Sequence, residues 1–188
     1  RKMVYDSFTP PCLCDIIDEN IKAGFYDSEF TKLYTKDEIN QLQTFINHDR
    51  DEDLTYAAME QFRGKYLVQN RATGKIYETP QVSYMMIAAT LFSKYPAKKR
   101  MAYVKAYYDA ISTFKISLPT PVMAGVRTPQ RQFSSCVLIE TDDSLDSINA
   151  TSSAVVKYVS QKAGIGIGAG NIRAIGSPIR SGDATHTG

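Results

Sequence analysis

The thiol of Cys136 is the side chain in this 188-residue chain whose setting best suits chemistry. It follows two hydroxyl side chains, Ser134 and Ser135, and opens an apolar run with the pattern of a β-strand. Further along, the stretch 163–170 carries glycine at alternate positions, which lets the backbone approach a ligand closely. A thiol at the mouth of a strand, near backbone that can bind phosphate, predicts redox chemistry on a phosphorylated substrate.

Two hydroxyl residues could help to bind such a substrate. Thr120 follows a proline-fixed turn after a predicted strand, and Ser135 immediately precedes the thiol. Their hydroxyls and the nearby backbone amides could face a diphosphate without added positive charge. Taken singly, these residues also have a common structural explanation as turn or strand-end hydroxyls, and Cys136 as a small buried side chain. The local pattern alone leaves both interpretations open.

A second group of side chains fits a nucleotide. Arg173 and Arg180 lie in a predicted loop, while Asp143, Ser144 and Leu145 open a predicted helix. Guanidinium groups match phosphate oxygens with forked donors, and a helix N-terminus favours negative charge. The combination indicates a nucleoside triphosphate site, whereas two loop arginines alone are more often solvated surface residues.

The glycine pattern matches only the opening of a dinucleotide fingerprint. Gly164 and Gly166 come after the predicted helix, whereas a Rossmann phosphate turn lies between a strand and the start of a helix. This order disfavours a nicotinamide site.

The chain before these motifs is predicted to be mainly helical. Apolar residues recur at helical spacing over 13–21, and Thr35 with Glu38 forms a capping box at the start of another helix. Prolines introduce two further helices, at Pro80 and Pro96. A β-hairpin interrupts this region, with predicted arms at 65–68 and 75–77 around a glycine-bearing turn.

After Phe114 the pattern changes to short strand, proline turn, strand, helix, strand and glycine-rich loop. That alternation is typical of an α/β layer. Either Asp143 or Ser144 can cap the helix, whose small residues would let another helix approach closely. We therefore predict two domains, 1–113 and 114–188.

Composition and charge exclude several classes of protein. The formal net charge is +2 with mixed signs, and no basic stripe of the kind that nucleic acid requires is present. No apolar run approaches the roughly 20 residues that span a bilayer, and the start lacks a signal-peptide pattern. We expect a cytoplasmic protein that binds neither nucleic acid nor membrane.

The other cysteines and the first histidine receive structural roles. Three cysteines are an odd number for a secreted disulfide framework, so a reducing compartment is expected. Cys12 and Cys14 are too close for a usual zinc half-site and lack a second cluster, so no metal site is predicted. His48, beside Asp49 and Arg50, is predicted to belong to a cap or a surface cluster.

The motifs together carry a family resemblance. The ranges 116–121, 125–129, 131–136, 143–148 and 163–167 stand in one order and at close spacing. Together they resemble the large (alpha) subunit of aerobic class I ribonucleoside-diphosphate reductase, of the type found in enterobacteria and their large phages. The resemblance runs along nearly the whole chain but covers only about a quarter of such a subunit.

The resemblance implies a fold that changes from α+β to α/β. A mainly helical N-terminal domain with a β-hairpin is followed by the first strands and helix of a ten-stranded α/β barrel, which is incomplete in this chain. The chain opens at Arg1 and stops at Gly188, so we expect either a fragment or the product of a split gene.

The resemblance also assigns substrate-site residues. Cys136 becomes one half of a cysteine pair that reduces the ribose 2′ position, forms a disulfide, and is re-reduced by thioredoxin or glutaredoxin. Contact with the ribonucleoside diphosphate falls to Thr120, Ser135, Ala163 and Gly164.

An allosteric specificity site for a deoxynucleoside triphosphate or ATP is implied as well. It takes Asp143, Ser144, Leu145, Arg173 and Arg180, and the coupling to the substrate pocket would run through the glycine-rich segment.

Two further positions depend on the resemblance. Lys2 would lie at the edge of an ATP-binding activity domain. Gly168 stands where the family usually has Asn, which removes any contact made by that amide.

The implied partners follow from what the chain lacks. The family's radical cysteine and second reducing cysteine belong to the remainder of the large subunit, and a metal-containing small (beta) subunit supplies the radical. Large subunits are expected to form homodimers, and this chain itself should hold no cofactor. Alone, it is expected to be inactive, which leaves the alternative of a catalytically incomplete nucleotide-binding or dimerising fragment.

Overall fold

The computed structural model describes residues 10–161 and 163–188. The contacts divide the chain into two compact units, a helical unit that ends at Phe133 and a second unit, Ser134–Gly188. Lys2 lies outside the described residues.

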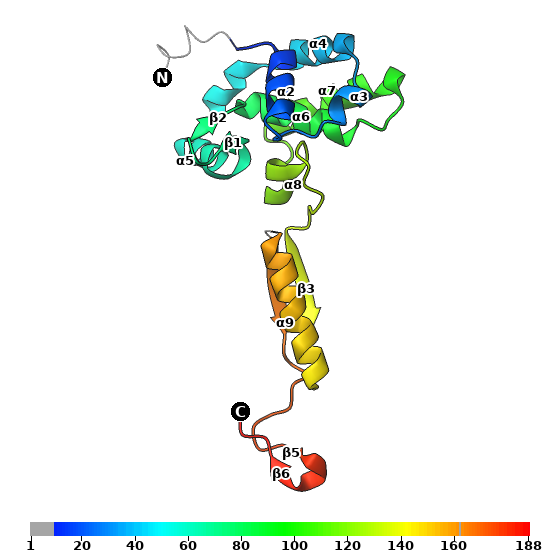
Figure 1. Ribbon diagram of the computed structural model, residues 1–188. Helices are drawn as coiled ribbons and strands as arrows, with labels where there is room; N and C mark the ends of the chain where they lie inside the picture. The colour runs from blue at the N-terminus through cyan, green and yellow to red at the C-terminus, as the bar shows by residue number, and fades with distance from the viewer. Residues whose placement is uncertain (1–9, 162) are drawn as a thin grey trace. The chain divides into compact units, whose positions relative to one another are not determined.

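Helices dominate the helical unit, as the periodicity predicted (Figure 1). In chain order its elements are α2 (Leu13–Lys22), α3 (Phe30–Leu33), α4 (Lys36–Phe45), the 3-10 turn η1 (His48–Asp53), α5 (Tyr56–Gln61), the π-helical turn η2 (Phe62–Tyr66), β1 (Gln69–Asn70), β2 (Lys75–Ile76), α6 (Pro80–Leu91), α7 (Ala97–Ser112) and α8 (Thr120–Gly125).

Local sequence explains where the main helices begin. Thr35 accepts from the Glu38 backbone while the Glu38 side chain accepts from the Thr35 backbone, which confirms the predicted capping box. Pro80 is the first residue of α6, and Pro96 directly precedes α7. Helix α6 is buried from Pro80 to Ala89, so it forms the centre of the core, with α7 and α8 packed against it.

The predicted hairpin is present but its first arm is displaced. Gln69 pairs with Ile76 and Asn70 with Lys75 in an antiparallel ladder. The predicted arm at 65–68 instead begins in η2, where Tyr66 packs edge-on against Phe62. Aromatic burial therefore overrides the strand preference of that stretch.

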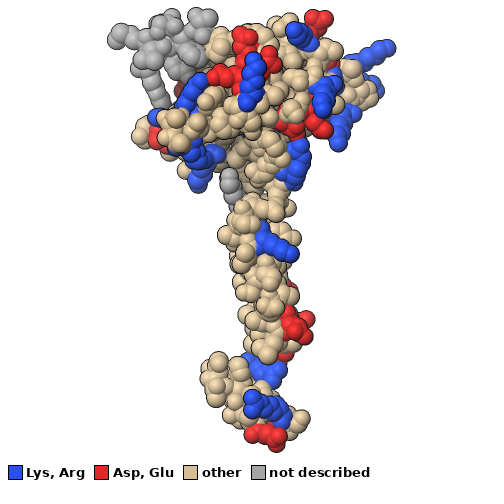
Figure 2. Space-filling view, viewed as in Figure 1, with Lys and Arg blue, Asp and Glu red and all other residues tan. Residues whose placement is uncertain are grey.

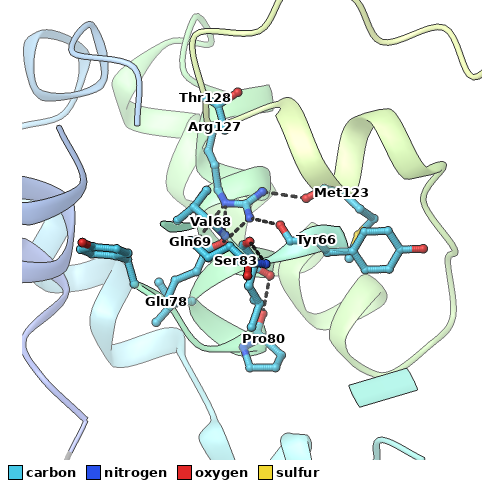
Figure 3. Close-up of polar contacts among 12 residues, drawn as sticks. Tyr66, Val68, Gln69, Glu78, Pro80, Ser83, Met123, Arg127 and Thr128 are labelled. Atoms are coloured by element: carbon cyan, nitrogen blue, oxygen red, sulfur yellow. Dashed lines mark hydrogen bonds and ion pairs between the residues drawn. The ribbon is translucent and has the colours of Figure 1, made fainter. Parts of the chain in front are cut away.

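A buried ion pair ties the end of the helical unit to its middle (Figure 3). The side chains of Arg127 and Glu78 are both 0% exposed. Arg127 Nε donates to Glu78 Oε2 at 2.8 Å, and the guanidinium also donates to the Met123 and Tyr66 carbonyls at 2.7 and 2.8 Å. Glu78 Oε1 accepts from the Val68 backbone N–H at 2.8 Å. Several hydrogen bonds from the protein thus replace the water that burial removes from the two charged groups.

The hydroxyl of Tyr26 completes this network by donating to Glu78 Oε2. Burial, followed by the Glu78 charge, raises the pKa of Tyr26 well above its ordinary value. Burial lowers the pKa of Arg127, but the Glu78 carboxylate raises it by more, so the guanidinium stays cationic.

The segment before Thr120 differs from the structure predicted from the sequence. A strand was predicted there, but 116–119 forms no strand and Thr120 is the first residue of the short helix α8. Proline explains the difference: Pro119 cannot donate to a strand ladder, and Pro121 suits the first turn of a helix.

The division between the units also falls later than the change of pattern at 113/114. Met123 and Val126 of the intervening segment belong to the buried core of the helical unit, and Arg127 enters its ion-pair network. These contacts keep 114–133 with the helices rather than with the strands that follow.

The second unit is built around a β-α-β element. Strand β3 (Cys136–Glu140) pairs in parallel with β4 (Gly164–Gly168), and α9 (Leu145–Ser160) connects them and runs alongside β3 (Figure 1). The chain continues through a small antiparallel pair, β5 (Pro178–Ile179) and β6 (Ala184–Thr185), joined by the turn η3 (Arg180–Gly182). Ser144, one of the two predicted caps, accepts from the Ser147 backbone N–H and confirms the helix start.

The predicted glycine-rich loop is wrong over most of its length, because Gly164–Gly168 is a strand. Two of its glycines lie close to side chains of the strand opposite. A Cβ on Gly166 would lie 2.8 Å from Leu138 Cδ2, and one on Gly168 would overlap the Glu140 carboxylate. Alternate glycines therefore make room for side chains of β3 rather than for a loop.

Removing the buried cation should destabilise the helical unit strongly. We expect Arg127→Met to lower the free energy of unfolding by about 3–5 kcal/mol, because it leaves the Glu78 carboxylate buried without its counter-charge. The matched control is Arg63→Met, which removes an exposed pair with Glu60 and should change stability by less than about 1 kcal/mol. Urea unfolding followed by far-ultraviolet circular dichroism gives both values, and equal effects would contradict the role of the network.

Candidate functional site

Cys136 is the first residue of β3, and its side chain is exposed. The register places it opposite Gly164, the first residue of β4. The Gly164 backbone N–H donates to the Ser135 carbonyl at 2.9 Å, while Ala163 beside it is 6% exposed. Four of the residues predicted to act together, Ser135, Cys136, Ala163 and Gly164, therefore meet at one end of the two-stranded sheet.

This end of the sheet offers a reactive group beside bare backbone. Gly164 has no side chain to cover the thiol, and a Cβ there would sit 3.5 Å from the Ser135 carbonyl oxygen. The Ser135 hydroxyl lies 3.9 Å from Cys136 Sγ. A ligand could thus contact sulfur, hydroxyl and backbone together. The other two cysteines belong to the helical unit.

Thr120 belongs to the helical unit, whereas Cys136 belongs to the second unit. It is exposed at the start of α8 in the helical unit, where Pro119 is the preceding cap residue. Its assignment to the substrate stays a prediction.

The opposite end of the sheet gathers the predicted effector residues. Arg173 Nε donates to both oxygens of Asp143, at 2.9 Å to Oδ1 and 2.7 Å to Oδ2. The Arg173 backbone N–H also donates to Asp143 Oδ1, at 3.3 Å. These bonds are the main cause that lowers the pKa of Asp143. The nearby His186 lowers it further. Asp143 therefore stays ionised and holds the arginine at the start of α9.

Ser144 and Leu145 lie at the same helix start, with different roles. The Ser144 hydroxyl caps α9 by accepting from the Ser147 N–H at 3.1 Å. Leu145 is 86% exposed, an unusual setting for a large apolar side chain. It offers a ligand an apolar surface next to the charged pair.

Arg180 does not join this group in the described part of the chain. It is exposed in η3 with a φ of 51°, and no hydrogen bond or ion pair among residues 10–161 and 163–188 links it to Asp143. Its assignment to the effector rests on the resemblance.

Sequence reasoning missed three neighbours of Asp143. Asn171 donates to Asp142 Oδ1 at 3.3 Å, which is a second contact between the segment after β4 and the segment before α9. His186 also lies near Asp143 and adds to the lowering of the pKa of that carboxyl. Asp142 and Asn171 were recognisable as polar residues flanking a predicted helix start and Arg173, but their pairing depends on the β3–β4 register.

Strand β3 physically links the two ends. Its five residues span on the order of 16 Å at about 3.3 Å per residue. At the far end the Thr141 backbone N–H donates to the Gly168 carbonyl at 2.9 Å. The Thr141 hydroxyl bonds to that of Thr151 at 2.9 Å inside the unit, which fixes α9 to the sheet.

One hollow lies within the helical unit. It has a volume of about 480 Å³, and its wall includes Phe30, Leu33 and Val122. None of the predicted site residues lines it.

On the face of the helical unit drawn in Figure 2, Lys and Arg side chains are interspersed with Asp and Glu. Among the described helices, none is long and apolar enough to cross a bilayer.

Comparison with known proteins divides the chain at nearly the same place as the structure does. Residues 52–131 match the family model of the ribonucleotide reductase all-alpha domain, and 134–188 match that of the ribonucleotide reductase barrel domain. The order of a helical domain and early barrel strands is therefore confirmed.

Individual relatives are similar over the full chain. It is 63% identical over 188 residues to the ribonucleoside-diphosphate reductase 1 subunit alpha of Escherichia coli (strain K12), and 49% identical over 188 residues to the subunit alpha of Enterobacteria phage T4. The chain is 31% identical to the ribonucleoside-diphosphate reductase subunit alpha of Treponema pallidum (strain Nichols) over 159 residues, which are 85% of this chain and 19% of that protein. The chain spans 25% of the length of the first two relatives.

Proposed function

Since the chain belongs to the ribonucleotide reductase large-subunit family, we propose that it forms the helical domain and first barrel strands of a subunit that reduces ribonucleoside diphosphates. The observation that carries this proposal is the exposed thiol of Cys136 beside the bare backbone of Gly164. The product would be the deoxyribonucleoside diphosphate, a precursor for DNA replication.

Cys136 supplies one of two thiols in this scheme. The second thiol belongs to the remainder of the subunit. The pair gives two electrons and two protons, the ribose 2′ hydroxyl leaves as water, and the two sulfurs form a disulfide. Thioredoxin or glutaredoxin restores the thiols. A metal-containing small subunit provides the radical that starts the reaction, and no residue of this chain replaces it.

Substrate binding would use the residues around the thiol. Ser135 and Ala163 border Cys136 and Gly164 at the sheet end, where amides and a hydroxyl suit the sugar and phosphate oxygens. Thr120 is assigned to the same substrate by the family resemblance alone.

The Asp143–Arg173 pair is proposed as the centre of the specificity site. A triphosphate would compete with Asp143 for the guanidinium, and the freed carboxylate would bind the effector's sugar hydroxyl. The helix start at Ser144 and the apolar Leu145 would complete the site, together with Arg180. Coupling to the substrate end along β3 is expected to be about 1–3 kcal/mol.

Assembly is part of this proposal. Leu138 of β3 and Val156 of α9 are 86% and 69% exposed, whereas parallel sheets are normally covered on both faces. We assign their covering to further barrel strands and to a second large subunit, which the exposed small residues Ala150 and Ser153 would let approach.

The alternative function is a catalytically incomplete fragment that binds nucleotide or dimerises. The observation in its favour is that the second unit contains Cys136 as its single thiol, so the 188-residue chain cannot form the reducing pair there. Alone, the chain is expected to show no turnover.

Replacing the thiol tests the catalytic assignment. In the complete subunit, Cys136→Ser should abolish thioredoxin-dependent deoxynucleotide formation, because the hydroxyl cannot form a disulfide. Effector binding should remain near the unmodified level, which shows that the variant is folded. Unchanged turnover would overturn the role of this residue.

Replacing the arginine tests the specificity site. We expect Arg173→Ala to weaken effector binding by about 10- to 100-fold, since hydrogen bonds to charged groups contribute about 1.5–3 kcal/mol. In the same variant, the bound effector should discriminate less between substrates with different bases. Lys157→Ala, at the other end of α9, is the matched control and should bind normally; an intact selectivity profile in Arg173→Ala would remove the arginine from the site.

A further inference from the structure

Two cysteines lie together at the start of α2, in the helical unit. Cys12 Sγ and Cys14 Sγ are 2.6 Å apart, and both side chains are partly exposed. Cys12 is the residue before the helix, yet its sulfur makes no capping bond. The pair is thus not explained by the local structure of the helix.

Two oxygen atoms that could act as metal ligands lie near these sulfurs. A carboxylate oxygen of Asp15 and the two sulfurs all lie within 4.8 Å of one another. From α4, Gln43 Oε1 lies 3.3 Å from Cys12 Sγ and accepts from the Leu13 backbone N–H at 3.0 Å. The cluster therefore contains two thiols, a carboxylate and an amide oxygen, contributed by two helices.

We propose that Cys12, Cys14, Asp15 and Gln43 bind a thiophilic divalent cation of the zinc type. Such a cation takes four ligands tetrahedrally, at about 2.3 Å from sulfur and about 2.0–2.2 Å from oxygen. The sulfurs of a tetrahedral site are about 3.8 Å apart. The two sulfurs need to separate by only about 1 Å to reach that spacing, which side-chain rotation at this half-exposed position allows.

The proposed site carries a small net negative charge. Binding releases one proton from each thiol to solvent, so two thiolates and one carboxylate face a 2+ cation and leave a net charge of −1. A negative site suits the N-terminus of α2, a helix of 10 residues. Loss of the Cys12 proton also frees the lone pair of Gln43 Oε1 that this thiol occupied.

The sequence alone pointed away from a metal. The spacing Cys-x-Cys is shorter than that of usual zinc half-sites, and no second cysteine cluster follows. The structure supplies the missing ligands as oxygens, one from the next residue of α2 and one from α4. This inference is independent of the proposed reductase function.

Titration with Cd²⁺ tests the site. The reduced 188-residue chain should bind one Cd²⁺, with an ultraviolet sulfur-to-cadmium charge-transfer band that Zn²⁺ removes by competition. Cys12→Ser and Cys14→Ser should each weaken binding at least about tenfold. Asp15→Asn should weaken it less, while the matched controls Cys136→Ser and Asp18→Asn should bind as the unmodified chain does. Binding that survives both Cys12→Ser and Cys14→Ser, or that needs Cys136, would overturn the proposal.

Alkylation gives a readout that needs no variant. With Zn²⁺ present, Cys12 and Cys14 should resist iodoacetamide while the exposed Cys136 is labelled, as mass spectrometry of the peptides would show. Equal labelling of all three cysteines with and without Zn²⁺ would contradict the site. A Cys12–Cys14 disulfide that forms in air despite excess Zn²⁺ would contradict it as well.

Discussion

The parallel pairing of β3 with β4 determines the geometry of both proposed nucleotide sites. This single register sets Cys136 beside Gly164 at one end and brings the loop that carries Arg173 to Asp143 at the other. A shift by one residue would turn every side chain of β3 to the opposite face. Both proposed sites would then lose their geometry at once, so the ladder positions both of them.

The two units differ in how much of their own structure they bury. The helical unit encloses a charged network around Arg127 whose partners are all present, and α6 is buried along most of its length. The second unit has little interior, since Thr141, Thr151 and Ala163 are its buried residues among those described. A two-stranded parallel sheet lacks the further strands that would cover it. The helical unit therefore has a buried core of its own, whereas the second unit resembles the first strands and helix of a barrel whose other strands are absent from this chain.

Local signals in the sequence predicted the elements whose stability is local. The capping box of Thr35 and the cap at Ser144 depend on contacts within one helical turn, and both are present. The glycines of β4 were misassigned because the sequence does not show that Gly166 and Gly168 lie beside Leu138 and Glu140 across the ladder. Contacts such as that of Gln43 with Cys12 join residues far apart in the chain and leave no periodic trace. The thiol and the Asp143–Arg173 group could be found from residue types, but the pairing itself could not.

The most direct measurement is a crystal structure of the complete subunit with a ribonucleoside diphosphate and a deoxynucleoside triphosphate bound. We expect the Cys136 sulfur in van der Waals contact with the ribose, within about 4 Å of its 2′ carbon. We also expect the triphosphate at the opposite end of β3, with its phosphates on Arg173. A sulfur enclosed by hydrocarbon side chains and remote from any ligand would contradict the central claim.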